Sequence, residues 1–597
     1  MFLALTPHPQ FWEFRNNSIM LLGDWCINDK TKPILEGKNY SIVQSPWKDK
    51  RIYESVPYCF ELMRFWMPHF TKILNEVHGI EKTERYWKVL LSCWLYDYIS
   101  ILYDKYLRIE KAIEEYGDIE TYFLNENAFL PLLNLETQWK LLADDDFHLQ
   151  MFSIIGREMG LNAKTVNLSK KERRLYTDLS AQTQWKRKLK SLVIQGITKI
   201  LQNLNQFLKK DVILEGFAAG YKFKLSQVLG QNLLYSVPNI HFGYLENEEC
   251  GSVSKNLNRD VLEKLPSRNK FEQIARKAIN IGFPQVCFEK YETILKGVTP
   301  YIQKRRKMAI AITNWYADEP FKFVAAEIAD EGGRLIGLQQ GGAFGAVIDM
   351  ASELVERYIT DVFVGSGWSE KEDIKKEICE VVPLPIPKYS KIKNSHRCKT
   401  DKCIFVGNMI PKYVYKIQTF LIPEEMEEYF HWKCIFFKKL REDILKRFCY
   451  RPFFGDYGWN EIGRIKKEFL EMDILRGGNL ISKMKKCKLV VSDHLGSSHL
   501  ESLIMNVPTV LYWDKEIFKI RPSAVKYFDS LRDAKILHDE PASAAAHIND
   551  VFDDVNKWWG SESVQNVRVQ FVNYMGLSSK NWMYEWSDFV KKQLDLV

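Results

Sequence analysis

The sequence predicts an α/β protein with Rossmann-like parallel sheets in two domains, and three observations support this fold class. The chain has 597 residues, too many for one hydrophobic core, so we expect roughly two to four domains. From residue 307 onward, strand patterns alternate with helix patterns, which is typical of a parallel sheet. Residues 487–514 give a strand, a small-residue loop, a short helix, a proline and a second strand. We therefore expect helices packed around parallel sheets.

Composition and charge exclude several classes of protein. Apolar residues make up 46% of the chain and charged residues 27%, as in globular proteins without long disordered segments. No apolar run reaches the ~18 residues of a spanning helix, and residues 1–6 lack a basic leader, so we expect a cytoplasmic protein. The eleven cysteines include no C-x-x-C pair and fit reduced core thiols. The net charge of +8 comes without a nucleic-acid-binding motif, so we expect no nucleic-acid partner.

The first domain is expected to span residues 1–370. Residues 2–6 and 18–27 have strand patterns, and a helical period then runs from residue 55 to about 210. We interpret residues 50–210 as a large helical insertion in this domain.

The second domain is expected to follow a linker at residues 371–400, which is rich in proline and charge. A second sheet starts at Cys403, so the domain spans residues 401–541. Helices at 542–597 should pack back on the N-terminal domain, with their aromatic residues in the core.

Two segments could contact a ligand. Gly341 and Gly342 lie between a strand and a helix and would permit close approach of a backbone, although a tight turn would also need glycine. The loop Gly496, Ser497 and Ser498 follows a buried strand and starts a helix, where backbone N–H groups and hydroxyls favour a phosphate.

Glu501, one turn into that helix, could bind a ribose. The alternative is that Ser498 is an N-cap with Glu501 completing a capping box. His494 lies beside the loop and could donate a proton to a leaving group. Arg451 and Asp456 cluster in a further loop and are added as ligand-binding and catalytic candidates.

No metal site or cofactor is expected. His494 and His499 lack a third ligand at a suitable spacing. The acidic run 144–146 lies in the helical region, where helix capping or surface charge explains it better than metal binding.

Several motifs carry a resemblance to a known family. They are LLGDWC at 21–26, residues 78–106, GLQQGG, DYGWN, HLESLIMNVPTVLYWD and DVNKWWGSESVQ. Together they resemble the LIC12162-type transferases of bacterial surface-carbohydrate and O-antigen clusters, nearly end to end. The resemblance implies a GT-B-like glycosyltransferase, in which two Rossmann-like domains face a cleft and the C-terminal one binds the nucleotide-sugar.

The implied donor is a CMP-activated sugar acid, pseudaminic acid or a related nonulosonate. The implied acceptor is a capsule or O-antigen glycan, lipid-linked, which would bring the protein to the inner membrane as a peripheral partner. No metal is needed, because helix dipole and hydroxyls can stabilise the single leaving phosphate.

The chain departs from the family at the glycine turn. Family members have Q-H-G-G, whereas this chain has Gln339-Gln340-Gly341-Gly342. Gln340 cannot take a proton at neutral pH, so an inverting reaction needs another base, Asp24 or Asp456. Alternatively the reaction retains configuration and the donor phosphate accepts the proton.

Other functions stay open at this point. The donor could be CMP-Kdo or another nucleotide-sugar, and a CDP-alcohol phosphotransferase would use the same serine loop. A polysaccharide-binding scaffold without activity is the non-enzyme alternative.

Overall fold

The computed structural model describes the chain except residues 48–51, 167–209, 232, 234–256, 303–305 and 370–377. The chain divides into two compact units. The N-terminal unit contains Met1–Leu335, Lys412–Ile417 and Val597, and the C-terminal unit contains Ile336–Pro411 and Gln418–Leu596. The division thus falls inside strand β8 (Arg334–Leu338), whereas the sequence places a linker at 371–400.

The first sheet lies in the N-terminal unit and has the strand order β3-β2-β1-β4-β5 with parallel pairing throughout. Its strands are β1 (Phe2–Ala4), β2 (Ser18–Leu21), β3 (Asn39–Ile42), β4 (Glu120–Leu124) and β5 (Asn162–Val166). This is a doubly wound order, which reverses between β1 and β4. In such sheets the carboxyl ends of the strands at the reversal are the usual place for a ligand.

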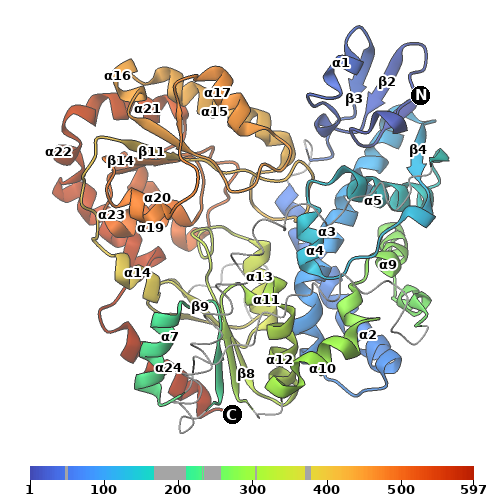
Figure 1. Cartoon of the computed structure of the whole chain (residues 1–597), viewed down its shortest axis with the longest axis horizontal. Coiled ribbons are helices and arrows are strands. Elements are labelled where there is room, and N and C mark those ends of the chain that lie inside the picture. The colour runs from blue at the N-terminus through green and yellow to red at the C-terminus, as the bar shows by residue number, and fades with distance from the viewer. Residues whose placement is uncertain (48–51, 167–209, 232, 234–256, 303–305, 370–377) are drawn as a thin grey trace. The chain divides into compact units, whose positions relative to one another are not determined.

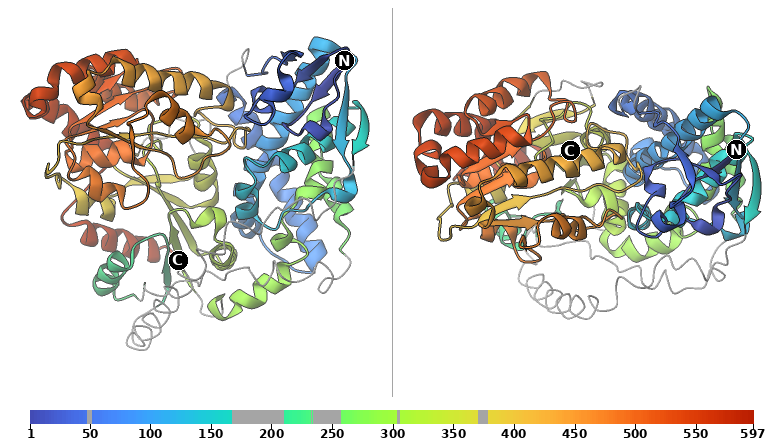
Figure 2. Two further views of the ribbon diagram at one scale, coloured as in Figure 1. Left: turned by 45° about the horizontal axis from the view of Figure 1, so that its top comes forward. Right: turned by 90° about the horizontal axis from the view of Figure 1, so that it is seen from above.

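The expected helical insertion at 50–210 is only partly helical. It holds the long helices α2 (Val56–His78) and α3 (Glu84–Tyr116), which lie side by side in Figures 1 and 2. It also holds β4 and β5, because these strands pair with β1 and belong to the first sheet. β5 lies at the sheet edge and has the mixed sequence NAKTV, so no apolar strand pattern marks it. Residues 167–209 of the expected insertion lie outside the described residues.

The other described helices of this unit complete it. They are α1 (Lys32–Leu35), α4 (Leu135–Lys140), α5 (Asp145–Glu158), α7 (Ala219–Leu229), α9 (Lys270–Gly282), α10 (Tyr291–Ile302), α11 (Asn314–Ala317) and α12 (Glu319–Asp330).

The second sheet has the order β10-β9-β8-β7-β6. Besides β8, its strands are β6 (Val212–Leu214), β7 (Met308–Ala311), β9 (Val362–Gly365) and β10 (Glu380–Pro383). β7 and β9 are buried along their whole length, which agrees with the continuous apolar runs of the sequence.

The third sheet lies in the C-terminal unit and repeats the doubly wound order as β13-β12-β11-β14-β15-β16, again parallel. Its order reverses between β11 and β14. The strands are β11 (Cys403–Val406), β12 (Phe448–Arg451), β13 (Asp473–Ile474), β14 (Leu489–Ser492), β15 (Thr509–Tyr512) and β16 (Leu537–His538).

Helices cover both faces of the third sheet (Figure 1). Phe405 and Val491 pack on one side with α15 (Met426–Lys439) and α21 (Pro541–Val551), while Ile404 and Val490 pack on the other with α19 (Ser497–Met505) and α23 (Glu562–Met575). The remaining helices are α13 (Ala351–Ile359), α14 (Pro387–Ile392), α16 (Glu442–Leu445), α17 (Glu461–Glu468), α18 (Leu480–Met484), α20 (Pro522–Asp533), α22 (Val555–Trp559) and α24 (Trp582–Leu594).

The C-terminal helices were expected to pack back on an N-terminal domain that spans residues 1–370. They belong to the C-terminal unit, which begins at Ile336 and so includes the last part of that expected domain. Helices α21 and α23 cover the third sheet, and the chain then reaches the segments after β9 and β10. There Leu577 N donates to Ser366 O (2.9 Å) and Trp586 Nε1 donates to Pro385 O (2.8 Å). Trp586 and Phe571 are fully buried, in agreement with their assignment to the core.

Candidate functional site

The glycine turn and the start of α19 come together in the C-terminal unit. A Cβ atom on Gly342 would lie 2.3 Å from the carbonyl oxygen of Gly496, which is closer than any side chain allows. A Cβ on Gly341 would lie 3.8 Å from Ser497 Oγ, an ordinary contact. Glycine is therefore required at 342 for close backbone approach, and the two ligand-contact segments of the sequence lie against each other.

Gln339 holds the glycine turn in place. Its Nε2 donates to Gly341 O (2.8 Å), and its Oε1 accepts from Ser366 N (2.9 Å) and Trp368 Nε1 (2.7 Å). The neighbouring Gln340 donates through Nε2 to the carboxylate of Glu356 on α13. The Gln340 side chain is thus a hydrogen-bond donor to a carboxylate, which fits an orienting role and not that of a base.

The start of α19 leaves polar groups available to a ligand. Gly496 is the N-cap, and His499 Nδ1 accepts its backbone N–H (3.1 Å). The alternative with Ser498 as N-cap and Glu501 in a capping box is wrong, because the imidazole three residues after Gly496 takes that role. Ser497 is exposed, and within the described residues neither its hydroxyl nor that of Ser498 has a hydrogen-bond partner. Hydroxyls and helix N–H groups at one point form an anion site.

Glu501 lies one turn further along, with a side chain that is 7% exposed. Its Oε1 pairs with Lys388 Nζ of α14, whose side chain is about half exposed. This ion pair orients the carboxylate and ties α19 to α14.

His494 borders the same loop from β14. Its Nδ1 lies 3.0 Å from Asp493 Oδ1, and a Cβ on Gly496 would lie 2.7 Å from its Nε2. The Asp493 carboxylate therefore orients the ring so that Nε2 approaches the start of α19.

A buried ionic cluster supports this edge of the third sheet, and sequence reasoning missed it. Lys433 of α15 is fully buried, pairs with Glu461, lies 3.7 Å from Asp493 Oδ2 and donates to Asn408 O (3.3 Å). Asn408 follows β11 and Asp493 follows β14, so the cluster joins the two strands at the reversal. The sequence feature that could have indicated this cluster is the single lysine inside the apolar run FHWKCIFF.

The cluster keeps its tyrosine neutral. Burial raises the pKa of Tyr450 well above its ordinary value, and the nearby Glu461 and Asp493 raise it further. Tyr450 OH lies 3.3 Å from Lys433 Nζ. The lysine thus carries the positive charge among two carboxylates and a neutral phenol.

Two buried donors at this edge lack a hydrogen-bond partner within the described residues. They are Asn408 Nδ2 and His499 Nε2. Burial lowers the pKa of His499 to about 3, with the charge of His494 adding to the effect, so this ring is neutral and carries its proton on Nε2. Buried donors without partners are rare and indicate groups that a ligand or water satisfies.

Arg451 and Asp456 organise the loop after β12. Arg451 Nη1 donates to the carbonyls of Leu475 and Gly477 (both 2.9 Å). Asp456 Oδ1 accepts from Asn460 N (2.7 Å), just before α17. These contacts give both residues a structural task within residues 451–477, and no described contact joins them to α19.

Asp24 lies in the N-terminal unit, apart from the other candidates. It is exposed and opens a short 3-10 turn directly after β2. The next residue, Trp25, donates through Nε1 to Leu5 O (3.0 Å), which ties this turn to the segment after β1.

Each residue of the acidic run 144–146 has different partners. Asp144 caps α5 by accepting from Phe147 N (2.7 Å), which agrees with the capping interpretation. Asp145 binds Lys412 Nζ and Tyr413 OH (2.7 Å each), and Asp146 lies 2.8 Å from His8 Nε2. Asp145 and Asp146 therefore make specific polar contacts, which surface charge alone does not describe.

Neither a metal cluster nor a spanning helix is found in the part of the chain that the structure describes. No group of three or more His, Cys, Asp or Glu side chains there could hold a metal ion. No helix among these residues is long and apolar enough to cross a membrane.

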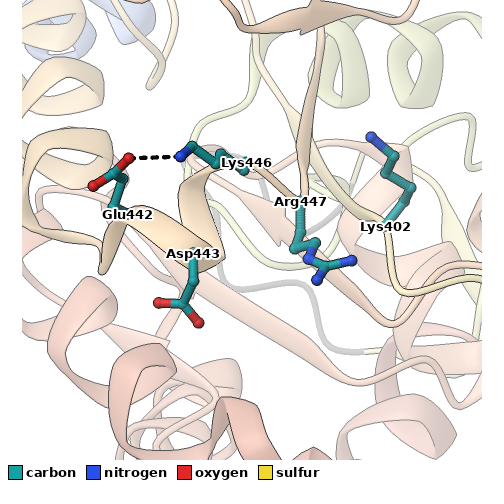
Figure 3. Close-up of a pocket in the computed structure, with 5 residues that line it drawn as sticks. All are labelled: Lys402, Glu442, Asp443, Lys446 and Arg447. Atoms are coloured by element: carbon teal, nitrogen blue, oxygen red, sulfur yellow. Dashed lines mark hydrogen bonds and ion pairs between the residues drawn. The ribbon is translucent and has the colours of Figure 1, made fainter.

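An open pocket of about 660 Å³ lies at the opposite edge of the third sheet (Figure 3). Lys402 precedes β11, and Arg447 precedes β12, so the pocket lies at the amino ends of the strands. Lys446 pairs with Glu442 (2.6 Å) and Arg447 with Asp401, so two of the three lining cations already have carboxylate partners. It is separate from the site at the carboxyl ends.

Comparison with solved structures finds distant likenesses. MnaA of S. aureus with UDP has 10% identity and covers 65% of this chain and 98% of its own, with a TM-score of 0.35. The wall teichoic acid polymerase TagF soaked with CDPG has 10% identity and a TM-score of 0.30, and the match covers 70% of this chain and 99% of TagF. Trehalose-6-phosphate synthase OtsA has 9% identity and a TM-score of 0.34, and the match covers 65% of this chain and 99% of OtsA. At such values these likenesses assign no function.

Comparison at the level of sequence gives the family. No curated protein matches the chain. The model of the LIC12162 family transferases matches residues 1–590, which is nearly the whole chain. The expectation of an enzyme that transfers a group is therefore confirmed. The chain belongs to the LIC12162 family of transferases.

Proposed function

We propose that this transferase is a GT-B-type glycosyltransferase that moves a sugar acid, pseudaminic acid or a related nonulosonate, from a CMP-activated donor to a bacterial surface glycan. The observation that carries the proposal is the start of α19. There the Ser497 hydroxyl lies near Gly341, and the Gly496 backbone lies against Gly342, at the reversal point of a doubly wound sheet. Neither the Ser497 nor the Ser498 hydroxyl has a partner within the described residues.

The roles follow from chemistry. Ser497, Ser498 and the backbone at Gly496 would bind the donor phosphate. Gly341 would leave room for it, while Gly342 lets the turn approach Gly496. His494 would donate to the leaving phosphate, and Glu501 would accept from the ribose. Asn408 Nδ2 and His499 Nε2 offer further donors to the donor sugar or its phosphate. An inverting reaction needs a base that takes the proton of the acceptor hydroxyl, for which the sequence offers Asp24 or Asp456. A retaining reaction, in which the donor phosphate takes that proton, is the alternative.

A CDP-alcohol phosphotransferase is the second candidate, because the same anion site would bind a diphosphate. The two differ in the bond that breaks. A glycosyltransferase breaks the bond between the anomeric carbon and the phosphate oxygen and releases CMP. A phosphotransferase also releases CMP, but it leaves a phosphate in the product.

The test uses the full chain with a CMP-nonulosonate, CMP-Kdo, CDP-glycerol or a UDP-hexose, each with a lipid-linked bacterial glycan as acceptor. We expect CMP release and a glycan heavier by one nonulosonate only with the first donor. Activity with CDP-glycerol alone would support the phosphotransferase. The absence of product from any donor, together with retained glycan binding, would support a scaffold.

A further inference from the structure

The first sheet carries a histidine and aspartate pair at its own reversal point. His8 follows β1, and Asp146 lies in the first turn of α5, which leads from β4 to β5. His8 Nε2 and Asp146 Oδ1 are 2.8 Å apart. β1 and β4 are the two strands between which the order reverses, so the pair lies where a doubly wound sheet usually binds its ligand.

The pair is held in position and open to solvent. The segment between β1 and His8 is fixed by Trp25 Nε1, which donates to Leu5 O (3.0 Å), and by Trp12 Nε1, which donates to Thr6 O (2.8 Å). Asp144 and Asp145 have other partners, which leaves Asp146 to the histidine. The His8 side chain is 29% exposed, so an acceptor can reach it.

Charge around the ring suits a base at neutral pH. Burial lowers the pKa of His8, but the hydrogen bond and charge of Asp146, with the charges of Asp145 and Asp144, more than offset this and raise the pKa above its ordinary value. Lys412 pairs with Asp145 and reduces the contribution of that carboxylate. Asp24 follows β2, which lies one strand away from the reversal between β1 and β4.

We propose that His8, oriented by Asp146, is the base that takes the proton of the acceptor hydroxyl, in place of Asp24 or Asp456. This rests on the proposed glycosyl transfer. The acceptor oxygen forms a bond to the anomeric carbon, the bond from that carbon to the phosphate oxygen breaks, and its electron pair leaves with CMP. The hydroxyl proton goes to His8 Nδ1, because Nε2 faces the Asp146 carboxylate at 2.8 Å. Asp146 is a positioning residue that stabilises the imidazolium.

The experiment compares His8→Asn, Asp146→Asn and Asp24→Asn with His69→Asn, an exposed histidine of the same unit. A CMP-nonulosonate and a lipid-linked glycan are the substrates, and melting temperature and CMP affinity are measured beside transfer. His8→Asn should lower kcat for transfer about 100-fold or more, with CMP affinity unchanged. His69→Asn should keep most of the activity. Loss of transfer in Asp24→Asn together with full transfer by His8→Asn would assign the base to Asp24 and overturn the proposal.

The pH profile separates a catalytic role from a structural one. Removal of the Asp146 charge lowers the pKa of His8, so the acid limb of the rate profile should move to lower pH in Asp146→Asn as kcat falls. Full transfer by His8→Asn, or an acid limb that does not move in Asp146→Asn, would overturn the role of His8. If the wild-type protein is active in the same assay, the proposed function stands. Absence of transfer by the wild-type protein would overturn both.

Discussion

The reversal points of the first and third sheets differ in chemistry although their strand orders match. At the first, His8 and Asp146 form a pair that can exchange a proton. At the third, the start of α19, two serines and the glycine turn form the proposed phosphate site, supported by the buried Lys433 cluster. In the proposed mechanism the same backbone order serves proton transfer at one sheet and anion binding at the other, and the residues at the strand ends decide which. The following variants test this division.

Lys433→Met should have the largest effect on stability. It leaves the carboxylates of Glu461 and Asp493 buried without their cation, and removal of one partner from a buried ion pair costs about 3–5 kcal/mol. Denaturant unfolding measures the loss. Lys438→Met is the control, because Lys438 lies on the same helix with an exposed side chain. Equal stability of the two variants would show that the cluster does not support the third-sheet edge.

Gly342→Ala should abolish nucleotide binding, while Gly341→Ala should not. The first places Cβ against the Gly496 carbonyl and forces the turn away from α19, whereas the second meets only Ser497 Oγ at 3.8 Å. Gly342→Ala should lower CMP affinity about 100-fold or more, because overpacking strain of about 1–3 kcal/mol adds to the loss of the displaced contacts. Gly341→Ala should change CMP affinity only a few-fold. Calorimetry measures both. Similar affinities would mean that the ligand does not use this contact.

Ser497→Ala combined with Ser498→Ala should lower CMP affinity at least about tenfold, because each lost hydrogen bond to a charged phosphate is worth about 1.5–3 kcal/mol. The melting temperature should hold, since neither hydroxyl has a protein partner in the described chain. His8→Asn is the matched variant at the other sheet and should bind CMP normally. Unchanged affinity in the double variant would remove the serines from the site.

Acid should destabilise the protein through His499. The folded-state pKa is about 3 and the ordinary value is 6.5, so between these pH values the unfolded chain binds a proton that the folded chain does not. As the pH decreases from 6.5, the free energy of unfolding therefore decreases by up to about 1.4 kcal/mol per pH unit. His499→Gln keeps a capping side chain and removes the titration, so its stability should depend less on pH between 6.5 and 5. Equal slopes would contradict this account.

Glu501→Gln should have the smallest effect on stability and a diagnostic effect on binding. The Lys388 side chain of this ion pair is about half exposed, so loss of the pair should lower the free energy of unfolding by less than about 1 kcal/mol. If Glu501 binds the ribose, CMP affinity falls and ribose-free phosphate binds as before. A lower melting temperature with normal CMP affinity would assign Glu501 to the contact with α14.

Local patterns predicted much of the fold but not the contacts of the site. The strands at 307–314 and 487–492 were found because buried parallel strands are continuous apolar runs. β5 was missed because an edge strand can be polar. The serine loop was selected from its place after a strand. The alternative with Ser498 as cap was wrong, since nothing in the sequence shows that the His499 ring reaches Gly496.

The pairs that join distant segments could not be predicted. His8 with Asp146, Lys433 with Glu461, and Gly342 with Gly496 each depend on how strands are ordered in a sheet. Arg451 and Asp456 were chosen because they cluster in sequence, and that clustering reflects a tight loop with its own hydrogen bonds.

A crystal structure of the full chain with CMP tests the central claim most directly. The account predicts the phosphate at the start of α19, within hydrogen-bond distance of the Ser497 and Ser498 hydroxyls and beside Gly341. Phosphate density at the opposite edge of the sheet, in the pocket between Lys402 and Arg447 (Figure 3), with an empty α19 start, would contradict it.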